Sequence, residues 1–264
     1  MKQFILKSEP DRENIVRLEN NDYRYLVRVR RFAVGEFFPA LLPGGEETLV
    51  QVLSVDGGVL TGKCSSPAEA ALPEESPQIP PIILFQALPK GEKMDLIVRQ
   101  AAESGITEIV PFVSEFSIAR AGSGEQKFSR WERIIKEARQ QSGSKTATSV
   151  RRPLTMDGLF DYWGKLKETG ALGLLFHFQQ GLEQESLHGY LNSIPRIVAL
   201  AVGPEGGFSN SEVSLFLENG FKPLTIGNTI LRTETAALYC AAAIRILLLE
   251  RDSWELKQVK KDSV

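Results

Sequence analysis

The sequence contains little cysteine and little histidine. Its 264 residues include two cysteines, Cys64 and Cys240, and two histidines, His177 and His188. The cysteines lie far apart and form no CxxC pair, so neither a cysteine-based metal site nor a disulfide scaffold is expected. Each cysteine is more simply interpreted as a small buried apolar residue. We therefore expect no bound metal.

The sequence also lacks long uncharged apolar runs and an excess of basic residues. No stretch approaches the roughly 18 residues of a membrane span, and the N-terminal MKQFILKSEPDREN lacks the apolar core of a signal peptide. We expect a cytoplasmic protein without a membrane partner. The formal net charge is -2, which counts against a dedicated nucleic-acid binder. Arginine nevertheless recurs between residues 17 and 31, which allows a local basic surface.

Proline is concentrated in one segment, residues 65–81, where hydrophobic periodicity is weak. Such a stretch disfavours helix and sheet alike and predicts a linker between two domains, residues 1–72 and 73–264. In the first domain, Tyr23–Arg30 alternates apolar and mostly basic residues, which predicts a half-buried strand. Glu47–Cys64 predicts a hairpin that turns at an Asp-Gly-Gly sequence. A small β-barrel fits these signals.

In the second domain, short apolar runs alternate with segments of helical spacing. The runs predicted as strands are 82–87, 106–113, 171–178, 197–202 and 223–226. The segments predicted as helices are 93–104, which stops at Gly105, and 130–141. Alternating strands and helices predict an α/β fold in which a parallel sheet is covered by helices on its faces.

A glycine-rich turn follows the apolar run at 197–202. It reads Gly203-Pro204-Glu205-Gly206-Gly207-Phe208, and Ser209 with Glu212 then forms a capping box that predicts a helix. A glycine turn at the carboxyl end of a parallel strand is where α/β sheets bind ligands. The turn has neither the GxGxxG nor the Gly-Lys-Ser/Thr spacing of a phosphate loop, and Glu205 would repel a phosphate. A cationic ligand is favoured, and a tight turn without a ligand is the alternative.

A second loop lies between residues 226 and 237 and reads IGNTILRTETAA. It opens an apolar helix predicted over 233–250. Free backbone N–H groups at Thr233 to Thr235 are able to bind a carboxylate or a base edge, and an ordinary capped core helix is the alternative. Because the apolar face of this helix is broad, we predict that it is buried on more than one side, at a homodimer interface.

The two loops, GPEGGFS and IGNTILRTETAAL, resemble the paired signature of the SPOUT methyltransferases, the class with a deep trefoil knot. Three more segments are similar to the 16S ribosomal RNA uracil-N3 methyltransferase family: QALPKGEKMD at 86–95, ESGITEIVPFVSEFS at 103–117 and EARQQSGS at 137–144. The resemblance spans roughly residues 79–249 in the correct order. It implies a knotted α/β methyltransferase domain preceded by a small PUA-like β-barrel that binds RNA.

The resemblance implies an enzyme that uses S-adenosylmethionine to methylate N3 of a uridine in 16S ribosomal RNA, either free or within the small ribosomal subunit. Three loops would surround the cofactor. The implied cofactor-binding residues are Leu175, Phe176, Gly203, Pro204, Glu205, Gly206, Gly207, Ile226, Gly227, Ile230, Leu231, Arg232, Thr235 and Ala236.

Arg232 is the candidate catalytic residue, because a cation can stabilise the anion that uracil forms when its N3 loses a proton. A structural ion pair of Arg232 with Glu205 or Glu234 is the alternative. His177 is more simply a satisfied structural group than a general base, and no base is assigned. The residues expected to bind RNA phosphates are Arg24, Arg28, Arg30, Arg139 and Lys145.

Two other functions remain open. One is a ribose 2′-O RNA methyltransferase of the same fold, and the other is a non-catalytic RNA-binding protein of ribosome assembly. The methylated atom distinguishes a ribose 2′-O methyltransferase from a uracil-N3 methyltransferase. Binding of S-adenosylmethionine distinguishes either enzyme from a non-catalytic assembly protein.

Overall fold

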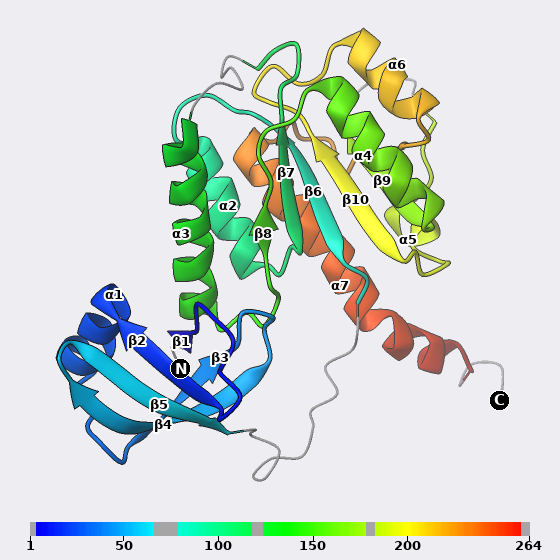
Figure 1. The fold of residues 1–264 in the computed structure, drawn as a ribbon. Coiled ribbons are helices and arrows are strands. Elements are labelled where there is room, and N and C mark those ends of the chain that lie inside the picture. Colours follow the sequence, from blue (N-terminus) through cyan, green and yellow to red (C-terminus); the bar gives the residue numbers. More distant parts are fainter. Residues whose placement is uncertain (1–3, 66–78, 118–123, 178–182, 260–264) are drawn as a thin grey trace. The chain divides into compact units, whose positions relative to one another are not determined.

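The structure, a computed structural model, describes residues 4–65, 79–117, 124–177 and 183–259 (Figure 1). The chain forms two compact units. The first unit comprises Met1–Glu75 with Arg139–Ala147, and the second comprises Ser76–Ala138 with Thr148–Val264. The predicted domain boundary at residues 72 and 73, and most of the predicted linker, lie outside the described residues.

The first unit is built on a five-stranded sheet with the strand order β1-β3-β4-β5-β2. Its strands are β1 Phe4–Ile5, β2 Ile15–Glu19, β3 Phe37–Leu41, β4 Glu47–Asp56 and β5 Val59–Ser65. The predicted hairpin is confirmed, since β4 and β5 pair antiparallel. Gly57 and Gly58 form the turn between them, both with positive φ, which glycine adopts without steric cost.

The strand predicted over Tyr23–Arg30 is wrong. The segment is helical, with α1 Asn20–Tyr23 continuing directly into π-helical turns, η1 Arg24–Val29. The buried residues are Asp22 and Leu26, four positions apart, whereas Val29 is 67% exposed. Positions four apart share one face of a helix, so burial follows the helical period and the apolar–basic alternation does not decide the structure.

The second unit contains a six-stranded sheet with the order β11-β9-β10-β6-β7-β8, in which every pairing is parallel. The predicted parallel α/β sheet is therefore confirmed. Its strands are β6 Ile82–Ala87, β7 Glu108–Phe112, β8 Ser149–Val150, β9 Ala171–Phe176, β10 Ile197–Val202 and β11 Lys222–Leu224. Because β6 is wholly buried and β10 nearly so, both strands are apolar along their length, apart from Gln86 in β6.

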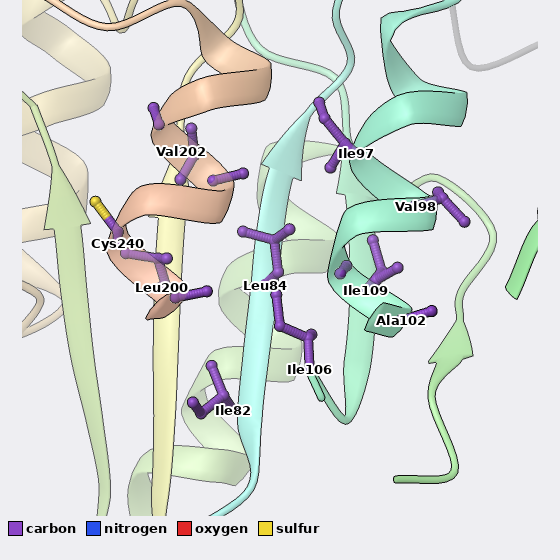
Figure 2. Close-up of a cluster of buried hydrophobic side chains, with 14 of the residues drawn as sticks. Ile82, Leu84, Ile97, Val98, Ala102, Ile106, Ile109, Leu200, Val202 and Cys240 are labelled. Carbon is purple, nitrogen blue, oxygen red and sulfur yellow. The ribbon is translucent and has the colours of Figure 1, made fainter. Parts of the chain in front are cut away.

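Helices cover both faces of this sheet (Figure 1). Alternate side chains of β6 and β10 point to opposite faces and enter two separate apolar cores. One core packs against α2 Lys93–Glu103, α3 Gly124–Ser142 and α7 Thr233–Val259, and the other against α4 Met156–Glu168 and α6 Asn210–Glu218. Figure 2 shows part of the first core, where Cys240 of α7 lies close to Leu200 of β10.

Local signals set several helix ends. Helix α2 stops before Gly105, which has φ +77°, as predicted. The predicted capping box of α6 is present, with the side chains and backbone of Ser209 and Glu212 bonded reciprocally. Helix α5, Leu187–Tyr190, has Ser186 as its N-cap. Cys64 and Cys240 are buried and unpaired, as predicted.

Within the described part of the chain, no helix has both the length and the apolar character needed to span a membrane.

Candidate functional site

A cavity of about 530 Å³ lies where β9 and β10 end and α7 begins. The carboxyl ends of parallel strands meet at one edge of a sheet, so the loops that follow them converge there. The residues lining the cavity are Lys93, Phe176, His177, Val202, Gly203, Pro204, Glu205, Gly206, Gly207, Phe208, Thr225, Thr229, Ile230, Leu231, Arg232, Thr233 and Ala236. Its wall is therefore formed by three loops, the last residues of β9 and β10, the first residue of α2 and the first turn of α7.

The loop after β10, Gly203–Gly207, is a tight turn that favours glycine at two positions. A Cβ on Gly203 would lie 3.1 Å from the carbonyl carbon of Gly207, so a side chain there would crowd the backbone of Gly207. Gly207 has φ +71°, and its N–H donates to the carbonyl of Pro204 at 3.0 Å. Both glycines line the cavity, where they carry no side chain that would keep a ligand away from the main chain.

Glu212 of helix α6 fixes the end of this turn. Its carboxylate accepts a bond from the backbone N–H of Ser209 at 2.9 Å and one from the N–H of Glu115 at 2.8 Å. The side chain is buried. Ionised carboxylates accept such bonds strongly, so the capping box also ties the turn to the segment that follows β7.

The loop before α7 is joined to the loop after β9. The Thr225 hydroxyl donates to the carbonyl of His177 at 2.9 Å, and the His177 N–H donates to the carbonyl of Leu224 at 3.3 Å. Further along the loop, Ile230 is 80% exposed. An apolar side chain at the mouth of a cavity, with so little protein against it, leaves a surface for a ligand to cover.

The loops after β10 and before α7 are also joined directly. The Thr233 hydroxyl donates to the carbonyl of Gly203 at 2.6 Å, and both groups are buried. The two glycine-bearing loops that the sequence singles out therefore lie side by side.

An ion-pair cluster borders the cavity. The Lys93 ammonium lies 2.9 Å from Oε1 of Glu205 and 3.6 Å from Oε2 of Glu234. The backbone N–H of Lys90 also donates to the Glu205 carboxylate, at 3.2 Å to Oε1. Burial raises the pKa of Glu205, but the hydrogen bonds from Lys93 and from backbone N–H groups outweigh it and bring the pKa below its usual value. Glu205 is therefore ionised near neutral pH and already neutralised by Lys93.

The same cluster bears on the two roles predicted for Arg232. Glu205 and Glu234 both face Lys93, and Arg232 is exposed at the cavity wall. Among the described residues, no ion pair joins Arg232 to an acidic group. The alternative of a structural pair with Glu205 or Glu234 is thus not seen, whereas the catalytic role stays a prediction.

Most of the predicted cofactor-binding residues line the cavity, and four do not. Leu175 is fully buried on the opposite face of the sheet, because alternation sends Leu174 and Leu175 to different cores. Ile226 packs against the first core, and Gly227 is exposed but is not part of the wall. Thr235 is exposed and points elsewhere, since the lining positions of α7 are 233 and 236, three residues apart.

The structure adds lining residues that the sequence prediction omits: Lys93, His177, Val202, Phe208, Thr225, Thr229 and Thr233. Lys93 stands in the segment QALPKGEKMD, so the family resemblance contained a signal for it. The sequence predicts for Thr233 a free backbone N–H at the start of a helix, but no role for its side chain. Its hydroxyl contact with Gly203 joins positions 30 residues apart and leaves no local signature.

The five predicted RNA-binding residues all belong to the first unit. Arg24 and Arg28 line a cavity of about 380 Å³ beside Tyr23, and Arg30 lies over the ring of Phe32, 5.7 Å from its centroid. Lys145 pairs with Glu47 at 3.1 Å. Arg139 is only 6% exposed, and burial lowers the pKa of its guanidinium. Phosphate binding by these residues stays a prediction.

In the ranges that the structure describes, no group of three histidine, cysteine or acidic side chains is placed to hold a metal ion.

Comparison with known proteins places these observations in context. A family model described as RNA methyltransferase domain matches residues 74–245. Ribosomal RNA small subunit methyltransferase E of Synechocystis sp. is 31% identical over 250 residues, which are 93% of this chain and 78% of that protein. The protein of the same name from Aquifex aeolicus is 29% identical over 235 residues, 89% of this chain and 95% of its own.

A solved structure is similar over nearly the whole chain. The crystal structure of a Ribosomal RNA small subunit methyltransferase E from Neisseria gonorrhoeae bound to S-adenosyl methionine superposes with a TM-score of 0.75 at 25% identity. The superposition covers 94% of this chain and 98% of the Neisseria gonorrhoeae chain.

Proposed function

Because this chain belongs to the RNA methyltransferase family, we propose that it uses S-adenosylmethionine to methylate N3 of a uridine in 16S ribosomal RNA. The observation that carries the proposal is the cavity in which three loops meet beside the glycine turn. The relatives named for the small ribosomal subunit support the RNA substrate, and the relative named as bound to S-adenosylmethionine supports the cofactor.

The residues present fit this cofactor, which supplies an activated methyl group when bound. A volume of about 530 Å³ is in the range of small-molecule sites. Gly203, Gly206 and Gly207 line the cavity and carry no side chain that would keep a ligand away from their main chain. Apolar side chains for an adenine ring are available in Phe176, Leu231 and Ala236.

The remaining task of the protein is to position and stabilise the uracil. N3 of uracil carries a weakly acidic N–H, comparable to a phenol. The N3 atom must lose this proton before or while it forms the bond to the methyl group. Arg232, exposed at the wall and free of an acidic partner among the described residues, is suited to stabilise the anion. Alignment of the two reactants supplies much of the acceleration in a displacement of this kind.

The proposal assigns RNA binding to the first unit. Arg24 and Arg28 lie on one short helical segment and face a common cavity with Tyr23. Arginine binds phosphates and a tyrosine ring stacks on unpaired bases, so this surface suits a single-stranded stretch of RNA. A PUA-like character of the first unit and a knot in the second belong to the same proposal.

A homodimer through α7 is part of the proposal as well. Tyr239, Ile246 and Leu249 of this helix are exposed large apolar side chains. Apolar residues grouped on one helix suit a partner surface. Sedimentation that gives the mass of a single chain at micromolar concentration would contradict the dimer.

The decisive experiment is mass mapping of methylated nucleosides in ribosomal RNA from cells with and without the gene. Loss of 3-methyluridine from 16S ribosomal RNA, restored by the intact gene, is the expected result. Loss of a ribose methyl group instead would replace the proposal with a 2′-O methyltransferase. No change in methylation, together with no binding of S-adenosylmethionine, would favour a non-catalytic role in ribosome assembly.

A further inference from the structure

Gln86 is a polar residue in the middle of the parallel sheet. It is 0% exposed and pairs with Val202, the last residue of β10, in the strand register. An amide buried at such a position is costly unless it forms hydrogen bonds. The hydrogen bonds of Gln86 therefore indicate why a polar side chain occupies this buried position.

The Gln86 amide nitrogen donates two hydrogen bonds. One goes to the carbonyl of Ala87 at 2.9 Å, and the other to the hydroxyl of Thr233 at 3.0 Å. The Thr233 hydroxyl in turn donates to the carbonyl of Gly203 at 2.6 Å. An amide nitrogen only donates, so the threonine oxygen must accept from it and must use its own proton on Gly203.

This chain of bonds joins the ends of two cofactor loops. Gly203 begins the loop after β10, and Thr233 closes the loop before α7 and lines the cavity. Gln86 lies at the carboxyl end of β6, between β10 and β7 in the sheet. Thr233, held by Gln86 of the buried strand β6, therefore joins two segments that are 30 residues apart in the chain.

A second connection between the same loops lies at the surface. Lys93 contacts Glu205 in the first of these loops and Glu234 beside Thr233. The Lys93 side chain is 35% exposed, so dissolved ions screen this connection. The buried connection through Thr233 is not screened, because neither Gln86 nor Thr233 has appreciable contact with solvent.

We propose that Thr233 is a positioning residue that holds the Gly203–Gly207 loop against the start of α7 in the geometry required for S-adenosylmethionine, with Gln86 fixing the direction of its hydroxyl. This inference rests on the proposed function for the identity of the ligand. It gives Thr233 a role that differs from that of a helix cap, since its hydroxyl bonds to Gly203 and not to the backbone of its own helix.

The test compares Thr233→Val with Thr233→Ser. Valine keeps the shape and removes both bonds, whereas serine keeps the hydroxyl. The binding of S-adenosylmethionine to the full chain is measured by calorimetric titration at low and at high salt. Thr233→Val is expected to weaken binding about tenfold, equivalent to about 1.4 kcal/mol, at both salt concentrations, and Thr233→Ser to stay within about twofold of the parent.

Thr148→Val is the matched control. The Thr148 hydroxyl is also buried and donates to a backbone carbonyl, that of Ile106, at 2.6 Å, but it does not line the cavity. This variant should lower the unfolding temperature and leave cofactor affinity unchanged. Equal loss of affinity in Thr233→Val and Thr148→Val would mean that the effect is general destabilisation and would overturn the proposal.

Three other outcomes are also decisive. Parent-like affinity of Thr233→Val, or equal loss in the valine and serine variants, would refute the positioning role while the proposed function stands. No binding by the parent protein would instead refute the proposed function. If Thr233→Val does not fold, Thr233→Ala replaces it, because alanine also lacks the hydroxyl, and parent-like affinity of that variant would refute the positioning role. Gln86→Met removes the donor but keeps the Thr233 hydroxyl, and parent-like affinity of this variant would refute the role assigned to Gln86.

Discussion

Substitution of Gly203 by alanine tests whether the turn after β10 forms the ligand site. The new Cβ would lie 3.1 Å from the carbonyl carbon of Gly207, 3.2 Å from its Cα and 3.4 Å from its oxygen. All three are backbone atoms, so no side-chain rotation relieves the contact. Gly203 itself does not have a positive φ, so the expected effect comes from crowding alone.

Overpacking of this kind costs about 1–3 kcal/mol. Glu205 and Gly206 are exposed whereas strand β10 is buried, so we expect the loop, and not the strand, to shift. A shift changes the shape of the cavity. If most of this overpacking cost reduces the free energy of binding, the affinity for S-adenosylmethionine falls roughly 5- to 150-fold. Calorimetric titration and thermal unfolding of the same samples separate this effect from loss of stability.

Gly164→Ala is the control for Gly203→Ala. Gly164 lies in α4, is exposed, and has no atom within 4 Å of an added Cβ. Alanine there should raise the free energy of unfolding by about 0.5–1 kcal/mol through helix propensity, with affinity unchanged. A folded Gly203→Ala variant that binds S-adenosylmethionine as tightly as the parent would refute the assignment of this turn to the ligand site.

Four further predictions concern the site and the cores. Arg232→Ala should reduce kcat about 10²- to 10³-fold with little change in cofactor affinity measured by titration, and a matching loss of affinity would argue against transition-state stabilisation. Lys93→Met should weaken cofactor binding and make the affinity less sensitive to salt, because the ion pairs with Glu205 and Glu234 are lost. An unchanged salt dependence of the affinity would contradict the role of these ion pairs. Trp163→Ala should lower the free energy of unfolding by about 3–5 kcal/mol in denaturant titration, since the ring is 1% exposed, packs at a tilt against Phe221 and donates to the carbonyl of Asn219. A change under about 1 kcal/mol would show that the second core tolerates the cavity. Burial, together with the hydrogen bond to Glu108, raises the pKa of Tyr162 from 10.0 to about 12. The protonated phenol of Tyr162 therefore contributes fully to the free energy of unfolding below pH 10, and this contribution is lost between pH 10 and 12. Tyr162→Phe should remove that alkaline loss of stability in unfolding experiments across this range.

The strands and helices of the second unit could be predicted because their signals are local. The buried strand β6 is apolar except for Gln86, and Ser209 with Glu212 marks the start of α6 within four residues. The two glycine-bearing loops were identified in the same way, as short sequences that follow predicted strands. Local signals failed over Tyr23–Arg30, where the apolar–basic alternation indicated a strand. The burial of Asp22 and Leu26 against the rest of the first unit selected a helix instead.

The sequence by itself thus determined the parallel α/β fold, the positions of the glycine loops and, through resemblance, the class of reaction. Only the tertiary structure decided how the site is assembled. The pairing of Lys93 with Glu205 and the bond from Gln86 to Thr233 join residues more than 100 positions apart. Such contacts depend on the path of the whole chain, because folding alone brings their donor and acceptor atoms within reach, and no periodicity or short motif records them.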